Sequence, residues 1–243
     1  MNILCIDIGN TSISYCHVKD DIIGKLNRIL NSDNLLEIFS EKNLNGIDLV
    51  LVCSVVPKLT STIFEYSKLK DLNIHEINYK SNYIKLLVDN PSEVGADRIC
   101  NIAAIKKIYN SPSIVIDFGT ATTYDITNKG GDFIGGAIAP GIDISANYLI
   151  EKTALLKETI YQFPKNVIGK NTKENIQSGV MYGGLQSVKG MIQLIKNEMN
   201  IKPNIIITGG FGEIISKHLD IKHVYIETLT IKGMLDIYNS QSN

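Results

Sequence analysis

The chain has 243 residues, of which 44% are hydrophobic and 20% charged, and its formal net charge is −1. This length supports one large core or two modest domains, and the composition is that of an ordinary soluble globular protein. A nearly balanced charge argues against a nucleic-acid partner, because such proteins carry a basic excess. The longest apolar run, residues 49–56, is too short to span a bilayer, so no membrane partner is expected.

The four cysteines lie far apart in the sequence and lack the spacing of zinc ligands. We therefore expect buried free thiols, which suit a reducing compartment. The chain opens directly on a predicted strand and shows no charged and apolar leader pattern. Together these features predict a cytoplasmic protein.

In the first half, apolar and β-branched runs predict strands at residues 3–8, 12–18, 22–29, 48–56 and 74–77. Helical periodicity and capping residues predict helices at residues 35–42, 60–69 and 96–109. The second half predicts strands at residues 113–117, 122–127, 133–138, 204–208 and 223–228. Its helices are expected at residues 142–156, at residues 172–198, from residue 213, and at the end of the chain.

The two halves open with the same arrangement, in which a buried strand runs into a glycine turn and a second strand. We interpret this as an internal duplication with domains at residues 1–113 and 114–243. Mixed strands and helices in this order predict an α/β protein of two related domains. Ligands of such sheets bind beyond the carboxyl ends of the strands, which is where both glycine turns lie.

The two turns carry an Asp-x-Gly motif, at residues 7–11 and 117–121. Glycine lets backbone N–H groups approach a phosphate closely, and Thr11 and Thr120 add hydroxyl donors. A single motif of this kind is more often an ordinary turn, but two copies at equivalent places predict phosphate binding. Because carboxylates repel phosphate, Asp7 and Asp117 are expected to hold a cation that bridges phosphate oxygens.

Two further segments have candidate roles. The buried strand at residues 205–208 runs into Gly209 and Gly210, whose bare backbone suits a flat purine, although an ordinary turn explains it equally well. Residues 90–98 place Asp97 and Arg98 in the first turn of a helix. The pair is compatible with a simple helix start, but Asp97 also suits a base that accepts a hydroxyl proton, and Arg98 suits a carboxylate.

Five motifs carry a resemblance to a known family: DIGNT (7–11), EVGADR (93–98), DFGTATT (117–123), GGAIAPG (135–141) and TGG (208–210). Through them the sequence resembles the type III pantothenate kinases along the whole chain. That family belongs to the acetate kinase, sugar kinase, Hsp70 and actin superfamily. The resemblance implies duplicated ribonuclease H-like (actin-type ATPase) domains with an interdomain nucleotide cleft. It also implies transfer of the ATP γ-phosphate to the 4′-hydroxyl of pantothenate, the first step towards coenzyme A.

On the nucleotide side, the resemblance implies that ATP is bound by Asp7, Ile8, Gly9, Asn10, Thr11, Ser12, Ile13, Ser14 and Thr120. It assigns the Mg²⁺ of ATP, through phosphate, to Asp7. It assigns a monovalent cation, K⁺ or NH₄⁺, to Asp117.

On the substrate side, the resemblance implies pantothenate binding by Gly95, Ala96, Asp97 and Arg98, with Asp97 as the catalytic proton acceptor. Thr172 matches a further substrate contact, and the family forms homodimers in which the partner subunit closes the pantothenate pocket. Many members have an aromatic substrate contact two positions before Asn-Pro, where this chain has Val88. Tyr83 is a candidate to replace that aromatic surface.

Two other functions compete with this one. A kinase of the same fold for another alcohol or sugar is less compatible with Arg98, because a cationic side chain suits a carboxylate better than a neutral sugar. A nucleotide-sensing regulator or chaperone-like ATPase has less need of an acid at position 97. Such proteins usually carry an additional partner-binding domain, for which the chain leaves no room.

Overall fold

The computed structural model describes residues 1–31, 35–109, 111–151 and 161–241. The chain forms two compact units. The first unit comprises Met1–Asn110, Asn128–Gly135 and Thr228–Asn243, and the second comprises Ser111–Thr127 and Gly136–Glu227. The predicted boundary between residues 113 and 114 follows the sequence repeat, whereas these units follow packing, so the first unit includes two segments from the predicted second half.

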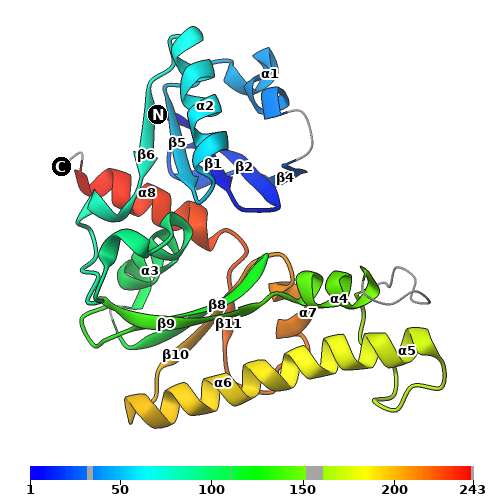
Figure 1. The fold of residues 1–243 in the computed structure, drawn as a ribbon. Helices are drawn as coiled ribbons and strands as arrows, with labels where there is room; N and C mark the ends of the chain where they lie inside the picture. Colours follow the sequence, from blue (N-terminus) through cyan, green and yellow to red (C-terminus); the bar gives the residue numbers. More distant parts are fainter. Residues whose placement is uncertain (32–34, 110, 152–160, 242–243) are drawn as a thin grey trace. The chain divides into compact units, whose positions relative to one another are not determined.

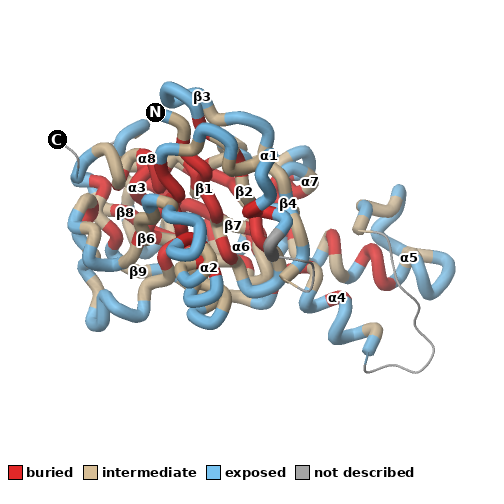
Figure 2. The backbone as a smooth tube through the Cα atoms, turned by 90° about the horizontal axis from the view of Figure 1, so that it is seen from above, coloured by how far each residue is buried: buried red, intermediate tan, exposed pale blue. Residues whose placement is uncertain are grey.

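The first unit contains a six-stranded sheet. Its strands are β1 (Asn2–Ile8), β2 (Ser12–Lys19), β3 (Ile22–Ile23), β4 (Asn27–Leu30), β5 (Leu49–Ser54) and β6 (Ile74–Ile77). The order is β3-β2-β1-β5-β6, and β4 also pairs with β2. β2 is antiparallel to β1, while β5 and β6 continue the sheet in parallel. Figure 2 shows β1 as buried along most of its length, as its apolar sequence requires.

The single strand predicted at residues 22–29 is wrong, because two short strands, β3 and β4, occupy this region and both pair with β2. Gly24 N donates a hydrogen bond of 2.8 Å to the His17 carbonyl oxygen. A Cβ at position 24 would lie 2.9 Å from that oxygen. The break therefore depends on the close approach that glycine permits.

The helical elements of the first unit are η1 (Leu35–Phe39), α1 (Glu41–Leu44), α2 (Pro57–Leu69), η2 (Tyr79–Ser81), η3 (Pro91–Glu93), α3 (Ala96–Tyr109) and α8 (Leu229–Gln241). The helix predicted at residues 60–69 begins earlier because Pro57 occupies the first helical turn, where its missing N–H costs nothing. α3 and α8 pack side by side (Figure 1, α8 in red). Gly233 makes this possible, since a Cβ there would overlap the Cys100 carbonyl group.

The second unit contains a five-stranded sheet in the order β11-β10-β7-β8-β9. Its strands are β7 (Ser113–Phe118), β8 (Ala121–Thr127), β9 (Phe133–Pro140), β10 (Asn204–Thr208) and β11 (Val224–Tyr225). β8 is antiparallel to β7, while β10 and β11 extend the sheet in parallel. This repeats the arrangement of β2, β1, β5 and β6, which is consistent with the predicted duplication.

The helices of the second unit are α4 (Ile142–Glu151), α5 (Thr172–Gln177), the π-helical turn η4 (Ser178–Tyr182), α6 (Gly183–Met199) and α7 (Gly212–Ser216). The predicted end of the helix at residues 142–156 lies outside the described residues. α6 packs its apolar side, which includes Leu185, Val188 and Ile192, into the core formed with the sheet (Figure 1, yellow). In the part of the chain that the structure describes, no helix has the length and hydropathy needed to cross a bilayer.

Candidate active site

The first Asp-x-Gly motif forms a tight turn between β1 and β2. Gly9 N donates a hydrogen bond of 3.0 Å to the Ser12 carbonyl oxygen. Asn10 and Thr11 are exposed at the tip, so their polar groups are accessible to a ligand. Asp7 lies at the end of β1 and is half-buried. An exposed tip with a hydroxyl side chain is what a phosphate-binding turn needs.

The remaining members of this predicted ATP-binding set lie deeper. Ile8 and Ile13 face each other across β1 and β2, and both side chains are buried in the core. Ser14 pairs with Asp7 in the sheet and is also buried, while Ser12 is half-buried. If these two isoleucines contact a nucleotide, they must therefore do so through backbone atoms.

Asn31 holds this turn in place through hydrogen bonds. Its residue type and its position in the sequence do not predict such a role. Its side-chain amide donates hydrogen bonds of 2.9 Å to the carbonyl oxygens of Gly9 and Asn10. Its backbone N–H donates a third bond, of 3.0 Å, to the Thr11 carbonyl oxygen. One residue just beyond β4 therefore holds the carbonyl groups of three successive residues of the turn.

The second element of the first unit is the turn that starts α3. The Arg98 backbone N–H donates a hydrogen bond of 2.7 Å to Asp97 Oδ1. Burial raises the pKa of the Asp97 carboxyl, and the Arg98 N–H and guanidinium offset only part of that rise. A Cβ at position 95 would lie 2.5 Å from Asp97 Oδ1, so Gly95 leaves the space that the carboxylate occupies. Ala96 is buried as the first residue of the helix.

Asp7 and Asp97 are brought to the same region of the first unit. Asp7 is the β1 partner of Cys53 on β5, and Cys100 lies one helical turn beyond Asp97 on α3. The hydrogen bond with Cys100, burial, and the negative charges of Asp7 and Asp97 all raise the pKa of the Cys53 thiol. The charges of both carboxylates therefore act on the same buried thiol. All four cysteines are free and buried, which confirms the expectation for them.

Arg98 lies against an aromatic ring that the motifs did not include. Its guanidinium carbon is 5.2 Å from the centre of the Phe133 ring. Burial and the charge of Asp236 raise the pKa of Tyr83, the aromatic candidate from the sequence, and the charge of Lys107 lowers it. The role of Tyr83 as a substitute aromatic surface stays a prediction.

The second Asp-x-Gly motif is enclosed by backbone from two other elements of the second unit. Gly141 N donates a hydrogen bond of 3.2 Å to the Thr120 carbonyl oxygen, and a Cβ at position 141 would overlap that oxygen. Gly209 has φ +88°, and a Cβ there would lie 2.5 Å from Phe118 N and overlap Asp117 Oδ1. Gly141 and Gly209 therefore both lie against the second Asp-x-Gly turn.

Asp117 lies in a setting that fits a cation. Its carboxylate is half-buried at the carboxyl end of β7, in a cradle that a side chain at position 209 would fill. The carbonyl oxygens of Gly119 and Thr120 lie against Gly141, and the Thr120 oxygen accepts the hydrogen bond from Gly141 N. Across the described ranges, no group of three or more His, Cys, Asp or Glu side chains is arranged to hold a metal. Any ion here would therefore be shared with a ligand or with backbone carbonyl oxygens.

Thr172 belongs to the second unit, whereas Gly95, Ala96, Asp97 and Arg98 belong to the first. It is exposed at the start of α5, where the Asn171 side chain accepts a hydrogen bond of 3.0 Å from Glu174 N. It lines a cavity of about 700 Å³ whose walls come mainly from β8, β9, α4, α5, η4 and α6. Most of that lining is apolar, including Tyr124, Ile142 and Val188.

The fold itself is shared with several solved structures. A protein from Campylobacter jejuni described as a conserved putative Baf family transcriptional activator matches with a TM-score of 0.62 and 23% identity, covering 99% of each chain. A putative 2-dehydro-3-deoxygalactonokinase from Sinorhizobium meliloti matches with a TM-score of 0.58 and 9% identity, covering 98% of this chain and 96% of the other. A putative N-acetylmannosamine kinase from Listeria monocytogenes matches with a TM-score of 0.54 and 13% identity, covering both chains fully (100% each). The chain thus has the α/β fold of the actin-like ATPases and sugar kinases.

Within that class the family is also clear. The sequence pattern of the type III pantothenate kinases matches residues 3–194. A type III pantothenate kinase from Sulfurihydrogenibium sp. (strain YO3AOP1) is 40% identical, covering 97% of this chain and all of the relative (100%). One from Persephonella marina is 37% identical, covering 99% of this chain and 100% of the relative. The chain belongs to the type III pantothenate kinase family.

Proposed function

We propose that this protein is a pantothenate kinase, which transfers the γ-phosphate of ATP to the 4′-hydroxyl group of pantothenate. Membership of the family supports this activity. The observation that carries it in this chain is the turn at the start of α3, where the Asp97 carboxylate lies beside Arg98 in the space left by Gly95. A base and a carboxylate-binding cation on successive residues suit a substrate that has both a hydroxyl group and a carboxylate.

In the proposed reaction, the 4′-oxygen forms a bond to the γ-phosphorus of ATP while the bond to the β–γ bridging oxygen breaks, and ADP leaves. The hydroxyl proton passes to Asp97. Because burial raises the pKa of Asp97, its carboxylate is a stronger base than an exposed one, yet it is ionised only above that raised pKa. Arg98 binds the substrate carboxylate and fixes the distance to the reacting hydroxyl group.

The two glycine turns are proposed to bind the phosphates of ATP, with contacts from Asn10, Thr11 and Thr120. Asp7 would contribute to holding Mg²⁺ with the phosphates, and Asp117 to holding K⁺ or NH₄⁺. When bound, such cations offset negative charge on the transferring group. Val88 and Thr172 are proposed as further substrate contacts.

The assembly is proposed to be a homodimer in the cytoplasm. Exposed apolar side chains on α4, namely Ile144, Tyr148 and Leu149, support an interface on this helix. Four free cysteines fit a reducing compartment. Light scattering coupled to gel filtration measures the assembly directly, and a monomer at micromolar concentration would contradict this part of the proposal.

The activity is tested by coupled measurement of ADP release with ATP, Mg²⁺ and K⁺, in the presence of pantothenate or of a panel of sugars. We expect stimulation by pantothenate and none by the sugars. Stimulation by a sugar, or no response to pantothenate, would contradict the proposed substrate.

Asp97→Asn then tests the base. We expect a loss of about 100- to 10,000-fold in kcat, the range for general base catalysis, with ATP binding retained. In the wild type, protonation of Asp97 should reduce kcat/KM at acidic pH, and this limb should lie above the ordinary carboxyl value of 3.8 because burial raises the pKa. Asp71→Asn is the control, since Asp71 is exposed at φ 54°, a conformation that asparagine tolerates. Normal turnover in Asp97→Asn would remove Asp97 as the base.

A further inference from the structure

Phe133 is a buried residue that none of the sequence motifs includes. It begins β9 and exposes only 2% of its surface. Its ring faces the Arg98 guanidinium, with 5.2 Å between the guanidinium carbon and the ring centre. This is within the roughly 6 Å over which a ring face attracts a cation. A buried aromatic residue therefore contacts the side chain proposed to bind the substrate carboxylate.

The backbone of Phe133 is fixed by the segment that carries Val88. Phe133 N donates a hydrogen bond of 3.0 Å to the Lys85 carbonyl oxygen, and Leu87 N donates one of 2.8 Å to the Phe133 carbonyl oxygen. Leu86 and Phe133 form a parallel bridge. The ring beside Arg98 and the segment that lacks the aromatic residue at position 88 are thus one hydrogen-bonded structure.

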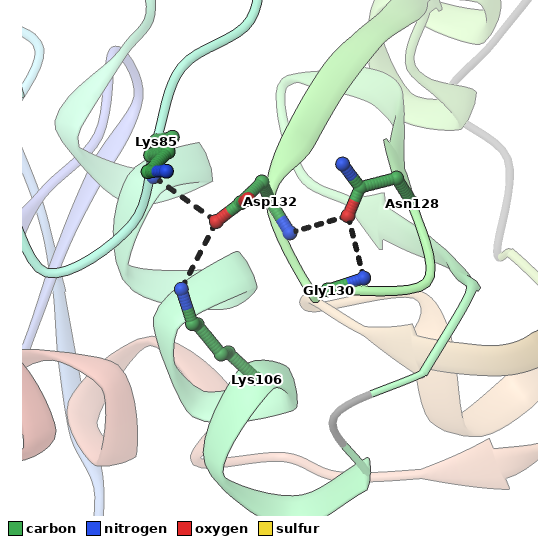
Figure 3. Close-up of polar contacts among 5 residues, drawn as sticks. All are labelled: Lys85, Lys106, Asn128, Gly130 and Asp132. Carbon is green, nitrogen blue, oxygen red and sulfur yellow. Dashed lines mark hydrogen bonds and ion pairs between the residues drawn. The ribbon is translucent and has the colours of Figure 1, made fainter.

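The residue before Phe133 anchors this structure to α3, as Figure 3 shows. Asp132 Oδ1 accepts a hydrogen bond of 3.0 Å from Lys106 Nζ and one of 3.3 Å from Lys85 N. Burial opposes ionisation of Asp132, but the bonds from Lys106 and Lys85 outweigh it and hold the pKa of this carboxyl below its ordinary value. Asn128 Oδ1 accepts hydrogen bonds of 3.0 Å from Asp132 N and 2.8 Å from Gly130 N, which closes the turn.

From this geometry we propose that Phe133 is a positioning residue for substrate recognition: its ring orients Arg98 so that the guanidinium edge is presented to the substrate carboxylate. The inference rests on the proposed function. A guanidinium stacked on a ring keeps its N–H groups directed outward in its own plane, where they match the two oxygens of a carboxylate. Ordering the long arginine side chain before the substrate arrives reduces the entropy lost on binding.

The test compares pantothenate with pantothenol, which has an uncharged hydroxymethyl group in place of the carboxylate. In Phe133→Leu we expect KM for pantothenate to rise about 3- to 30-fold, the range that one cation–π contact supports, with kcat changed little. KM for pantothenol should stay near its wild-type value. Phe133→Tyr keeps the ring and should restore KM for pantothenate. In a background of Arg98→Lys, Phe133→Leu should add little, because the two residues act together.

Phe39→Leu is the matched control, because Phe39 is also buried in the first unit, where its ring packs on Tyr66. If Phe133→Leu does not fold, pentafluorophenylalanine at position 133 provides a second test, since it keeps the ring's shape but weakens the attraction of its face for a cation. We expect this substitution to raise KM for pantothenate alone, and the same substitution at position 39 to have no effect.

Equal changes for both substrates, or no change in KM with the fluorinated ring, would overturn the positioning role. Failure of the proposed function is distinguishable, because then the wild-type protein itself would not phosphorylate pantothenate.

Discussion

The two Asp-x-Gly turns have nearly the same sequence but are held in different ways. The first turn is exposed at Asn10 and Thr11, and it is fastened from one side by hydrogen bonds from Asn31. The second turn is half-buried at Gly119 and Thr120. It is enclosed by the backbone of other segments, whose glycines leave no space for a side chain.

This difference indicates different tolerances. A turn held by side-chain hydrogen bonds can lose one of them and relax, because water replaces the missing partner at modest cost. A turn enclosed by close-packed backbone has no such freedom, since neither the main chain nor its neighbours can move without disturbing the sheet. We therefore expect substitutions around the second turn to have the larger effects.

Gly209→Ala should have the largest effect. The new Cβ would lie 2.5 Å from Phe118 N and overlap the Asp117 carboxylate, at a residue whose φ is +88°. We expect a loss of at least about 3 kcal/mol in the free energy of unfolding, and nearly complete loss of phosphate transfer in the folded fraction. Urea unfolding and the ADP-release assay measure the two effects.

Gly46→Ala is the control for strain alone, because Gly46 has φ +70° but a Cβ at this position would meet nothing closer than Asn2 Nδ2, at 3.9 Å. The free energy of unfolding of this variant should fall by only about 1–2 kcal/mol, and its activity should be unchanged. If Gly209→Ala cost no more than Gly46→Ala, the close packing around the second turn would be unimportant.

The cations proposed for the two turns give the next largest effect. Replacing K⁺ by Na⁺ should reduce the wild-type rate by about tenfold or more, because a poorly fitting ion neutralises less of the charge in the transition state. Asp117→Asn should be slow in both salts and nearly insensitive to the exchange. Asp7→Asn should remain sensitive to the exchange but require more Mg²⁺. Equal rates of the wild type in K⁺ and Na⁺ would contradict the role of Asp117, and loss of K⁺ dependence in Asp7→Asn would show that the two turns do not differ.

Much of the fold was predictable because its signals are local. The apolar runs of β1, β5, β7 and β10 and the glycine turns after them identify buried strands and their ends without reference to the rest of the chain. The α3 turn was also recognisable, since Gly95, Asp97 and Arg98 are neighbours in sequence. The family resemblance then supplied the activity, and family membership supports it.

The supports of the site were not predictable in this way, because each depends on residues far apart in sequence. Nothing around Asn31 indicates that its amide binds the carbonyl groups of a turn some twenty residues earlier. Phe133 looks like any strand residue until its pairing with the Lys85 segment places it beside Arg98. Gly141 and Gly209 were recognisable as turn residues, but the reason that they must be glycine is the second Asp-x-Gly turn, which comes from another part of the chain.

Asn31→Ala tests the tolerance of the first turn. It should have a smaller effect than Gly209→Ala or the replacement of K⁺ by Na⁺. Removal of two hydrogen bonds of 2.9 Å should cost about 1–2 kcal/mol in the free energy of unfolding. Because the turn can relax, we expect KM for ATP to rise by no more than about tenfold, with kcat largely retained. Asn27→Ala is the control, since the exposed Asn27 amide donates one bond of 3.2 Å to the Lys25 carbonyl oxygen and does not touch the turn. If Asn31→Ala had as large an effect as Gly209→Ala, the first turn would be as rigid as the second. A turn that can relax keeps its function when one supporting side chain is removed.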